Sequence, residues 1–379
     1  MAIDKPRQRA PSGTQLEAGI RGKSLEFLKA LVSNPSPSGY EQPVAREYRP
    51  YSETFADELS TDVLGNVTAV LNPQAKSRVV LLAHMDEVGF IIHFISDEGL
   101  LYFSPIGGHD SVVPAGQRVW VHGRGKTTGV IGRAEFTLMT SEKKDARPEL
   151  GELWIDIGAR SQSEAEDHVA VGDVVTFQYE FQKLLGDRAA SRAFDNKAGL
   201  WAIAEALRLL KEDGGLSPDV GVYAVATVQE EIGSRGAEVV TRSVSPQSGL
   251  AIDVGYARDH SAIDKRRSGQ LEMGKGPGIA CGPNANRMVF EILRSAAEDE
   301  KIPHQVTVFS TPAPTDGRVL QTSGAGVATG LIEIPLRYMH TPCEVVCLQD
   351  MSNTARLIAA YCRRLKPDSS FTVGGNKAR

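Results

Sequence analysis

Apolar and polar positions alternate along the chain in two different ways. Near both ends, segments with helical spacing alternate with short, continuous apolar runs of the length of buried strands. Strands alternating with helices predict a mostly parallel, mixed sheet sandwiched by helices, an α/β fold. The predicted strands are residues 66–71, 78–83, 222–228, 249–253 and 305–309, and the predicted helices are residues 24–32, 198–211, 286–301 and 353–365.

Between residues 90 and 185 the pattern changes to short β-rich pieces separated by turns that contain Gly and Pro. Only residues 161–168 suggest a helix there, so this segment is expected to form a small all-β barrel inserted into the α/β domain. The catalytic α/β domain is then discontinuous, comprising residues 21–89 and 186–367. Residues 1–20 and 368–379 are polar and are expected to form a mobile arm and a flexible tail.

Length, net charge and composition limit the number of domains and the kinds of partner that the protein can have. A single core usually stops growing at about 250–300 residues, so 379 residues are expected to form one large domain and a smaller one. With 42 Lys+Arg against 47 Asp+Glu, the net charge of −5 disfavours partners such as nucleic acid or an anionic membrane. No apolar stretch approaches the roughly 18–20 residues of a membrane helix, and no secretory signal is visible, so we expect a cytoplasmic protein. The cysteines are expected to be free thiols.

Candidate chemistry lies where polar residues directly follow apolar strand patterns, because active sites of open α/β sheets lie beyond the carboxyl ends of strands. His84 and Asp86 are two residues apart, so both side chains point to one side of an extended segment. Asp86 could therefore accept the second ring N–H of a metal-bound His84. The other candidates are Asp195, Glu230, Glu231, Asp253 and His340.

Each candidate also has a structural interpretation. Asp195 could be a helix N-cap, Asp253 a turn residue, and Glu230–Glu231 a solvated helix start. Their joint occurrence favours metal chemistry. Two histidines and three carboxylates, one of them bridging, could hold a pair of divalent ions such as zinc, cobalt or manganese. Two adjacent glutamates could divide metal binding and proton transfer between them. The turn at residues 107–110 is interpreted as structural.

Six stretches, in order, resemble the motifs of the dinuclear metallo-aminopeptidases that form tetrahedral particles, metallopeptidase family forty-two. This family includes glutamyl and deblocking aminopeptidases, and some members carry an endoglucanase label. The resemblance extends from Lys23 to Leu365. It departs from the usual pattern at Lys197, where Arg is more frequent, at Thr341, where Ser is, and at His109, where an aromatic residue is expected. The matching stretches are residues 84–89, 105–108, 192–199, 228–233, 251–254 and 335–342.

The resemblance implies a di-zinc exopeptidase-like fold with two divalent ions per subunit, zinc or cobalt foremost and manganese possible. His84 and Asp253 would bind one ion, Glu231 and His340 the other, and Asp195 would bridge them. Asp86 would orient His84, and Glu230 would be the general base. The inserted domain would serve oligomerisation, with dimers joined into a dodecamer.

The hypothesis is therefore a metal-dependent aminopeptidase that acts on peptide substrates. A related di-metal deacylase or aminoacylase would use the same ligands on a different amide. A glycoside hydrolase needs two carboxylates and leaves His84 and His340 unexplained. A catalytically silent scaffold is a further alternative. Side-chain preference stays open, with Arg287, Arg318 and Arg337 as candidates for a basic pocket residue.

Overall fold

The computed structural model describes residues 20, 22–135, 137, 140 and 146–372. The arm expected at residues 1–20, apart from Ile20, lies outside the described residues, as does the end of the tail. The helices are α1 (Gly22–Ser33), α2 (Gln42–Glu53), α4 (Gln162–Glu166), α5 (Phe194–Asp213), α6 (Arg235–Val244), α7 (Lys265–Ser268), α8 (Arg287–Asp299), α9 (Asp316–Thr322) and α10 (Leu348–Arg364), with a 3₁₀ turn at Leu150–Glu152.

The strands form one large sheet and one closed barrel. They are β1 (Glu58–Thr61), β2 (Val67–Leu71), β3 (Ser77–His84), β4 (Gly89–Ile95), β5 (Leu101–Ile106), β6 (Arg118–His122), β7 (Lys126–Gly132), β8 (Trp154–Asp156), β9 (Val174–Phe177), β10 (Gln182–Lys183), β11 (Arg188–Ser191), β12 (Val220–Thr227), β13 (Ser248–Tyr256), β14 (Gly278–Cys281), β15 (Gln305–Val308), β16 (Ala328–Arg337) and β17 (Glu344–Cys347).

The large sheet is mixed, with the order β1-β2-β12-β3-β13-β16-β17-β11-β10 and with β14 and β15 attached beside β16. Strands β12, β3, β13 and β16 run parallel and form its centre. Helices cover both faces, as the sequence of β3 requires. Val79 and Leu81 pack in the core beneath α1, α2, α5 and α10, whereas Val80 and Leu82 pack against α6 and α9. A central parallel strand is buried on both faces, which explains its continuous apolar run.

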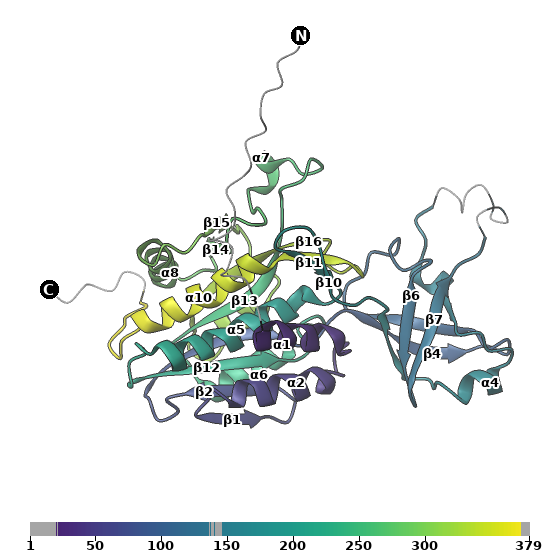
Figure 1. Ribbon diagram of the computed structural model, residues 1–379, viewed down its shortest axis with the longest axis horizontal. Coiled ribbons are helices and arrows are strands. Elements are labelled where there is room, and N and C mark those ends of the chain that lie inside the picture. The colour runs from purple at the N-terminus through teal and green to yellow at the C-terminus, as the bar shows by residue number, and fades with distance from the viewer. Residues whose placement is uncertain (1–19, 21, 136, 138–139, 141–145, 373–379) are drawn as a thin grey trace, which may run out of the picture.

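The barrel closes in the order β4-β5-β8-β7-β6-β9, and every pairing in it is antiparallel. It has its own apolar core, which includes Phe90, Phe103 and Ile155, and α4 adds Ala165 to it. Figure 1 shows the barrel standing to one side of the α/β unit. The predicted fold class, a mixed α/β sheet with an all-β barrel inserted in the chain, is confirmed.

Several elements differ from the sequence-based expectations. Helices α2, α6 and α9 were not predicted, and α2 carries Pro43 in its first turn and Pro50 inside it, which obscured its pattern. Helix α5 extends back to Phe194, but Asp195 and Asn196 adopt non-helical angles and kink its first turn, so its regular part begins after Asn196, close to the predicted residue 198. Phe371, in the expected flexible tail, packs against the core, and its carbonyl accepts a hydrogen bond from Asn286. Within the described part of the chain, no helix is both long and apolar enough to cross a membrane.

Candidate metal centre and active site

The central parallel strands bring the predicted residues to one edge of the sheet. His84 ends β3 and pairs in register with Thr227, which ends β12. Glu230 and Glu231 follow Thr227 directly in the chain, and Asp253 lies in the second half of β13, the other neighbour of β3. Because parallel strands end at the same edge, residues separated by more than 160 positions meet there.

Five side chains form two groups that share Asp195. Asp195 Oδ1 lies 3.2 Å from His84 Nε2, and Asp253 Oδ1 lies 3.7 Å from the same nitrogen. Asp195 Oδ2 lies 3.4 Å from His340 Nε2, which is also 3.4 Å from Glu231 Oε2. Within each group, the candidate ligand atoms all lie within 4.8 Å of one another. Ligand atoms bound about 2.1 Å from one tetrahedral ion would lie roughly 3.4 Å apart, which matches these distances.

The two groups differ in exposure. His84, Asp195 and Asp253 are buried, with at most 7% of each residue exposed. The His340 side chain is 30% exposed, because it stands on the loop after β16, at a backbone φ of +58°. The structure therefore brings together every residue predicted as a ligand. Both groups line one cavity, and His340 is the most exposed of the five side chains.

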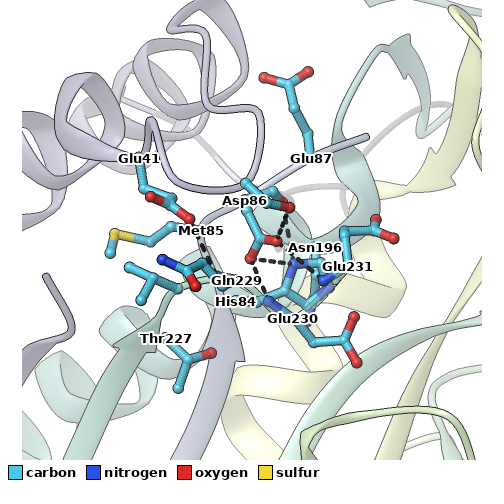
Figure 2. Close-up of polar contacts among 12 residues, drawn as sticks. Glu41, His84, Met85, Asp86, Glu87, Asn196, Thr227, Gln229, Glu230 and Glu231 are labelled. Atoms are coloured by element: carbon cyan, nitrogen blue, oxygen red, sulfur yellow. Dashed lines mark hydrogen bonds and ion pairs between the residues drawn. The ribbon is translucent and has the colours of Figure 1, made fainter. Parts of the chain in front are cut away.

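Asp86 is a fully buried carboxylate that ties three elements of the site together (Figure 2). Its Oδ1 lies 3.4 Å from His84 Nδ1, whose hydrogen-bond partner is the Asp86 carbonyl at 3.1 Å. Its two carboxylate oxygens also accept the backbone N–H groups of Glu230 and Glu231, each at 3.0 Å, and Ser38 donates to it at 2.7 Å. Asp86 thus positions the adjacent glutamates as well as His84.

Asp195 is held by its backbone, so its carboxylate is free to face both groups. Glu344 on β17 accepts the N–H of Asp195 and the N–H of His340, each at 2.9 Å. Asn196 donates to the Ile252 carbonyl at 2.7 Å, which fixes the start of α5 against the strand that carries Asp253. The alternative interpretation of Asp195 as an N-cap is wrong, because Asn196 caps the regular part of α5 instead, its Oδ1 accepting the Gly199 N–H at 3.0 Å.

The site concentrates negative charge. Burial would lower the pKa of His84, but hydrogen bonds to Asp195, Asp253 and Asp86 outweigh it and raise that pKa well above its ordinary value. Burial likewise opposes protonation of His340, yet Asp195 and Glu231 raise its pKa to about 11. Glu231 Oε1 is buried and has no hydrogen-bond partner among the described residues. An orphaned carboxylate oxygen, within a set of N and O donors that favours cations, fits divalent metal ions.

A model of the M42 glutamyl aminopeptidase family matches residues 65–357. The chain belongs to the M42 family. The lysyl aminopeptidase of Pyrococcus furiosus is 34% identical over 352 residues, 90% of this chain and 97% of that protein. A TET aminopeptidase from a marine-sediment Thaumarchaeota archaeon has a TM-score of 0.86 at 35% identity, covering 90% of this chain and 96% of that one. The Pyrococcus horikoshii TET1 peptidase, which can assemble into a tetrahedron or a large octahedral shell, has a TM-score of 0.79 at 30% identity, covering 90% and 100%.

Membership of the M42 family makes the protein a metal-dependent aminopeptidase, a hydrolase of peptide bonds. The family indicated by the six sequence motifs is confirmed. Residues 84, 195, 231 and 253 all fall within the matched segment, and so does residue 340.

The sequence analysis missed a buried cluster of charged residues that holds the segments around the M42 site in place. Glu87 is buried and accepts from Arg192, and Lys197 Nζ lies 3.0 Å from Glu87 Oε1. The same carboxylate accepts the Ser36 N–H at 2.9 Å, so the cluster fastens the segment before α2 to the strand end that carries His84. Lys197, where Arg is more frequent, still pairs with this carboxylate. The signal that could have found Glu87 is its place beside Asp86 at a buried strand end.

The barrel reaches the site through the loop after β5. A Cβ on Gly108 would lie 3.6 Å from His340 Nδ1, and one on Gly107 would lie 3.3 Å from the Glu231 Cβ. His109 stacks on Phe90 at 4.3 Å between ring centroids, and its Nε2 lies 2.8 Å from the Gly89 carbonyl. His109 therefore packs as an aromatic residue would, in keeping with the structural interpretation of this turn.

Proposed function

We propose that this M42 chain removes N-terminal residues from peptides by using two divalent ions. The observation that carries the proposal is the position of Asp195, whose two carboxylate oxygens face two separate histidines. His84 and Asp253 would hold one ion, Glu231 and His340 the other, and Asp195 both. Ions bound there would supply Lewis acidity, which lowers the pKa of a water molecule and polarises the scissile carbonyl. Zinc and cobalt suit this N/O donor set best, and manganese is also compatible with it.

Glu230 is proposed as the general base. It lines the cavity beside both groups, and Ser234 donates to its Oε1 at 3.2 Å. Burial, together with Asp253, Asp316 and Glu231, raises the pKa of Glu230 to about 9. A glutamate with this pKa is protonated at neutral pH and cannot act as a base. Divalent ions bound at the two groups would lower the pKa of Glu230 through their charge, so that the ionised carboxylate could take a proton from water and release it to the leaving amine. Asp86 would hold both glutamates and His84 in position during this transfer.

Assembly and location are part of the same proposal. The tetrahedral and octahedral shells of the Pyrococcus horikoshii TET1 peptidase support a homo-oligomer, and we propose a dodecamer built from dimers in the cytoplasm. The barrel, with residues 90–185 as its segment, would take part in these contacts. The family description names glutamyl substrates, whereas the Pyrococcus furiosus relative is a lysyl enzyme, so family membership leaves the side-chain preference open.

The first test is activity of metal-free and metal-loaded protein on aminoacyl p-nitroanilides and on the same compounds with an N-acetyl group. We expect cleavage to return with zinc, cobalt or manganese, and only for substrates with a free amine. Cleavage of the acetylated compounds would instead favour the deacylase alternative. Metal binding without turnover on either set would contradict the proposed function.

The role of Glu230 is tested by Glu230→Gln. We expect kcat to fall by about 10²- to 10⁴-fold, the usual contribution of a general base, while the metal content stays at two ions per subunit. Metal content is measured by mass spectrometry of the purified protein. Glu238→Gln, on the exposed side of α6 where Glu238 pairs with Arg242, is the matched control and should behave as wild type. Loss of metal from Glu230→Gln would contradict the assigned role.

A further inference from the structure

A cavity of about 360 Å³ lies beside the two metal-binding groups, and a buried carboxylate forms part of its wall. This carboxylate belongs to Glu333 on β16, which pairs in parallel register with Asp253 on β13. Paired residues of neighbouring strands point to the same face and lie about 4.8 Å apart. The Glu333 carboxylate is therefore one strand away from a proposed metal ligand, on the side of the sheet that carries the site.

The surroundings of Glu333 make room for a carboxylate, and among the described residues no cation forms an ion pair with it within 4 Å, although Arg258 is near enough to lower its pKa. A Cβ on Gly255 would lie 2.6 Å from Glu333 Oε1, so only glycine at that position leaves space for this oxygen. Thr307 donates to Oε2, and no described residue hydrogen-bonds to Oε1. Burial raises the pKa of Glu333 to about 7. An acid buried in this way without a paired cation is costly to keep unless a ligand supplies the positive charge.

Part of the cavity wall is apolar. Phe309, Ala313 and Leu331 line the same cavity. A cavity that combines apolar side chains with a buried carboxylate, beside the metal-binding groups, matches a side chain with an aliphatic stem and a cationic tip. Lysine and arginine have this form, because their methylene stems pack on apolar surface while the charged group seeks a polar partner.

Two arginines, Arg258 and Arg318, also line the cavity and would favour an acidic side chain instead. Arg318 is exposed and Arg258 is half-buried, so water weakens the field of both. Neither forms an ion pair with Glu333 within 4 Å among the described residues. Only 4% of Glu333 is exposed, so its charge acts where screening is weakest. An acidic side chain that reached this depth would meet Glu333 directly.

We propose that Glu333 makes this cavity a pocket for the cationic side chain of an N-terminal lysine or arginine. This inference rests on the proposed aminopeptidase function, which it deepens by naming the substrate class. Of the three arginines suggested by the sequence as determinants of an acidic preference, Arg337 is paired with Asp259 and Arg287 stands outside the cavity. Glu333 was not among the sequence-based candidates.

The test compares kcat/KM of the metal-loaded enzyme on p-nitroanilides of lysine, arginine, norleucine and glutamate. Norleucine has a straight aliphatic stem without the ammonium group. We expect lysine and arginine to be preferred over norleucine, and Glu333→Gln to lower kcat/KM for both by about 10- to 100-fold, the usual range for a hydrogen bond to a charged group. The norleucine value should change less than twofold. Glutamine keeps the volume of Glu333 and its contact with Thr307, so the variant is expected to fold.

The matched control is Glu298→Gln, an exposed residue of α8 that pairs with Arg294. It removes the same charge outside the cavity and should keep the wild-type preference. Equal loss on lysine and norleucine in Glu333→Gln would overturn the inference, as would a wild-type preference for glutamate, which would assign the pocket to Arg258 and Arg318. If the wild type cleaved the norleucine substrate as well as the lysine substrate, the inference about Glu333 would be overturned, but the proposed aminopeptidase function would stand. No turnover on any free-amine substrate would overturn the proposed function beneath it.

Discussion

The α/β unit and the barrel bury very different side chains. Among the described residues of the barrel, from Gly89 to Phe177, the buried polar side chains are Ser96 and Thr176, and the core is otherwise apolar. The α/β unit buries charged groups throughout its centre. These include Glu41, His84, Asp86, Glu87, Arg192, Asp195, Lys197, Asp253, Asp316, Glu333, Glu344 and Asp350.

The difference shows where the chain accepts a cost in stability. Removing a charge from water costs several kcal/mol per ion unless partners compensate it, so an apolar core is the more stable arrangement for a purely structural part. The barrel follows that rule. The α/β unit does not follow this rule at its strand ends. There the buried carboxylates of Asp86 and Glu344 accept hydrogen bonds from backbone N–H groups of other site residues. Buried charge therefore marks the chemical part of the molecule.

The largest effect on stability is expected from breaking the buried cluster of the α/β unit with Glu87→Gln. This variant leaves Arg192 and Lys197 buried without a carboxylate, which should lower the free energy of unfolding by about 3–5 kcal/mol at pH 7. Urea denaturation measures the change. Glu164→Gln, whose exposed carboxylate pairs with Arg160, removes a charge at the surface of the barrel segment and should be indistinguishable from wild type.

The pH dependence of stability, compared between the wild type and Glu87→Gln, sharpens this test. Burial would raise the pKa of Glu87, but Arg192 and Lys197 outweigh it and lower that pKa from its ordinary value of 4.5 to about 2. Because the folded-state pKa lies below the unfolded one, the ionised carboxylate stabilises the fold above pH 4.5. That contribution should disappear as the pH falls from about 4.5 towards 2, and Glu87→Gln should lack this part of the loss. If the free energy of unfolding of the wild type and of Glu87→Gln changed identically with pH, the ion pairs of Glu87 with Arg192 and Lys197 would not stabilise the fold.

Much of this contrast is visible in the sequence, and the remainder depends on tertiary structure. Apart from Asp195, the ligand candidates could be found because each follows or ends an apolar strand pattern, and the central parallel strands end at one edge. Glu344 and Glu333 could not be found from the sequence, because each lies inside an apolar run. Only the order of the strands in the sheet decides what each carboxylate faces. Asp195 was ambiguous for a similar reason. Its role follows from two non-helical residues at the start of α5, which no periodicity reveals.

A change in the barrel core should affect stability and leave the chemistry alone. Ile155 on β8 is fully buried, and Ile155→Val removes one methylene, which should cost about 0.5–1.5 kcal/mol. Metal content and kcat/KM should stay at wild-type values, because Ile155 packs within the barrel core. Thermal denaturation and the anilide assay together check this. Loss of metal would break the comparison, since it would mean that the barrel transmits changes in its packing through Gly107 and Gly108 to the site.

The smallest effect on stability is expected from removing a surface cation of the barrel that contacts an aromatic ring. Lys126 Nζ lies 3.3 Å from the centre of the Trp120 ring, and the two residues stand on the paired strands β7 and β6. Lys126→Met keeps an apolar stem over the ring and removes the cation, so we expect a loss of about 0.5 kcal/mol, the size of an exposed cation–π contact. Lys126→Arg should retain most of the stability, because a guanidinium also binds an aromatic face. A loss several times larger, measured as the shift in the urea midpoint, would show that the barrel too depends on charge.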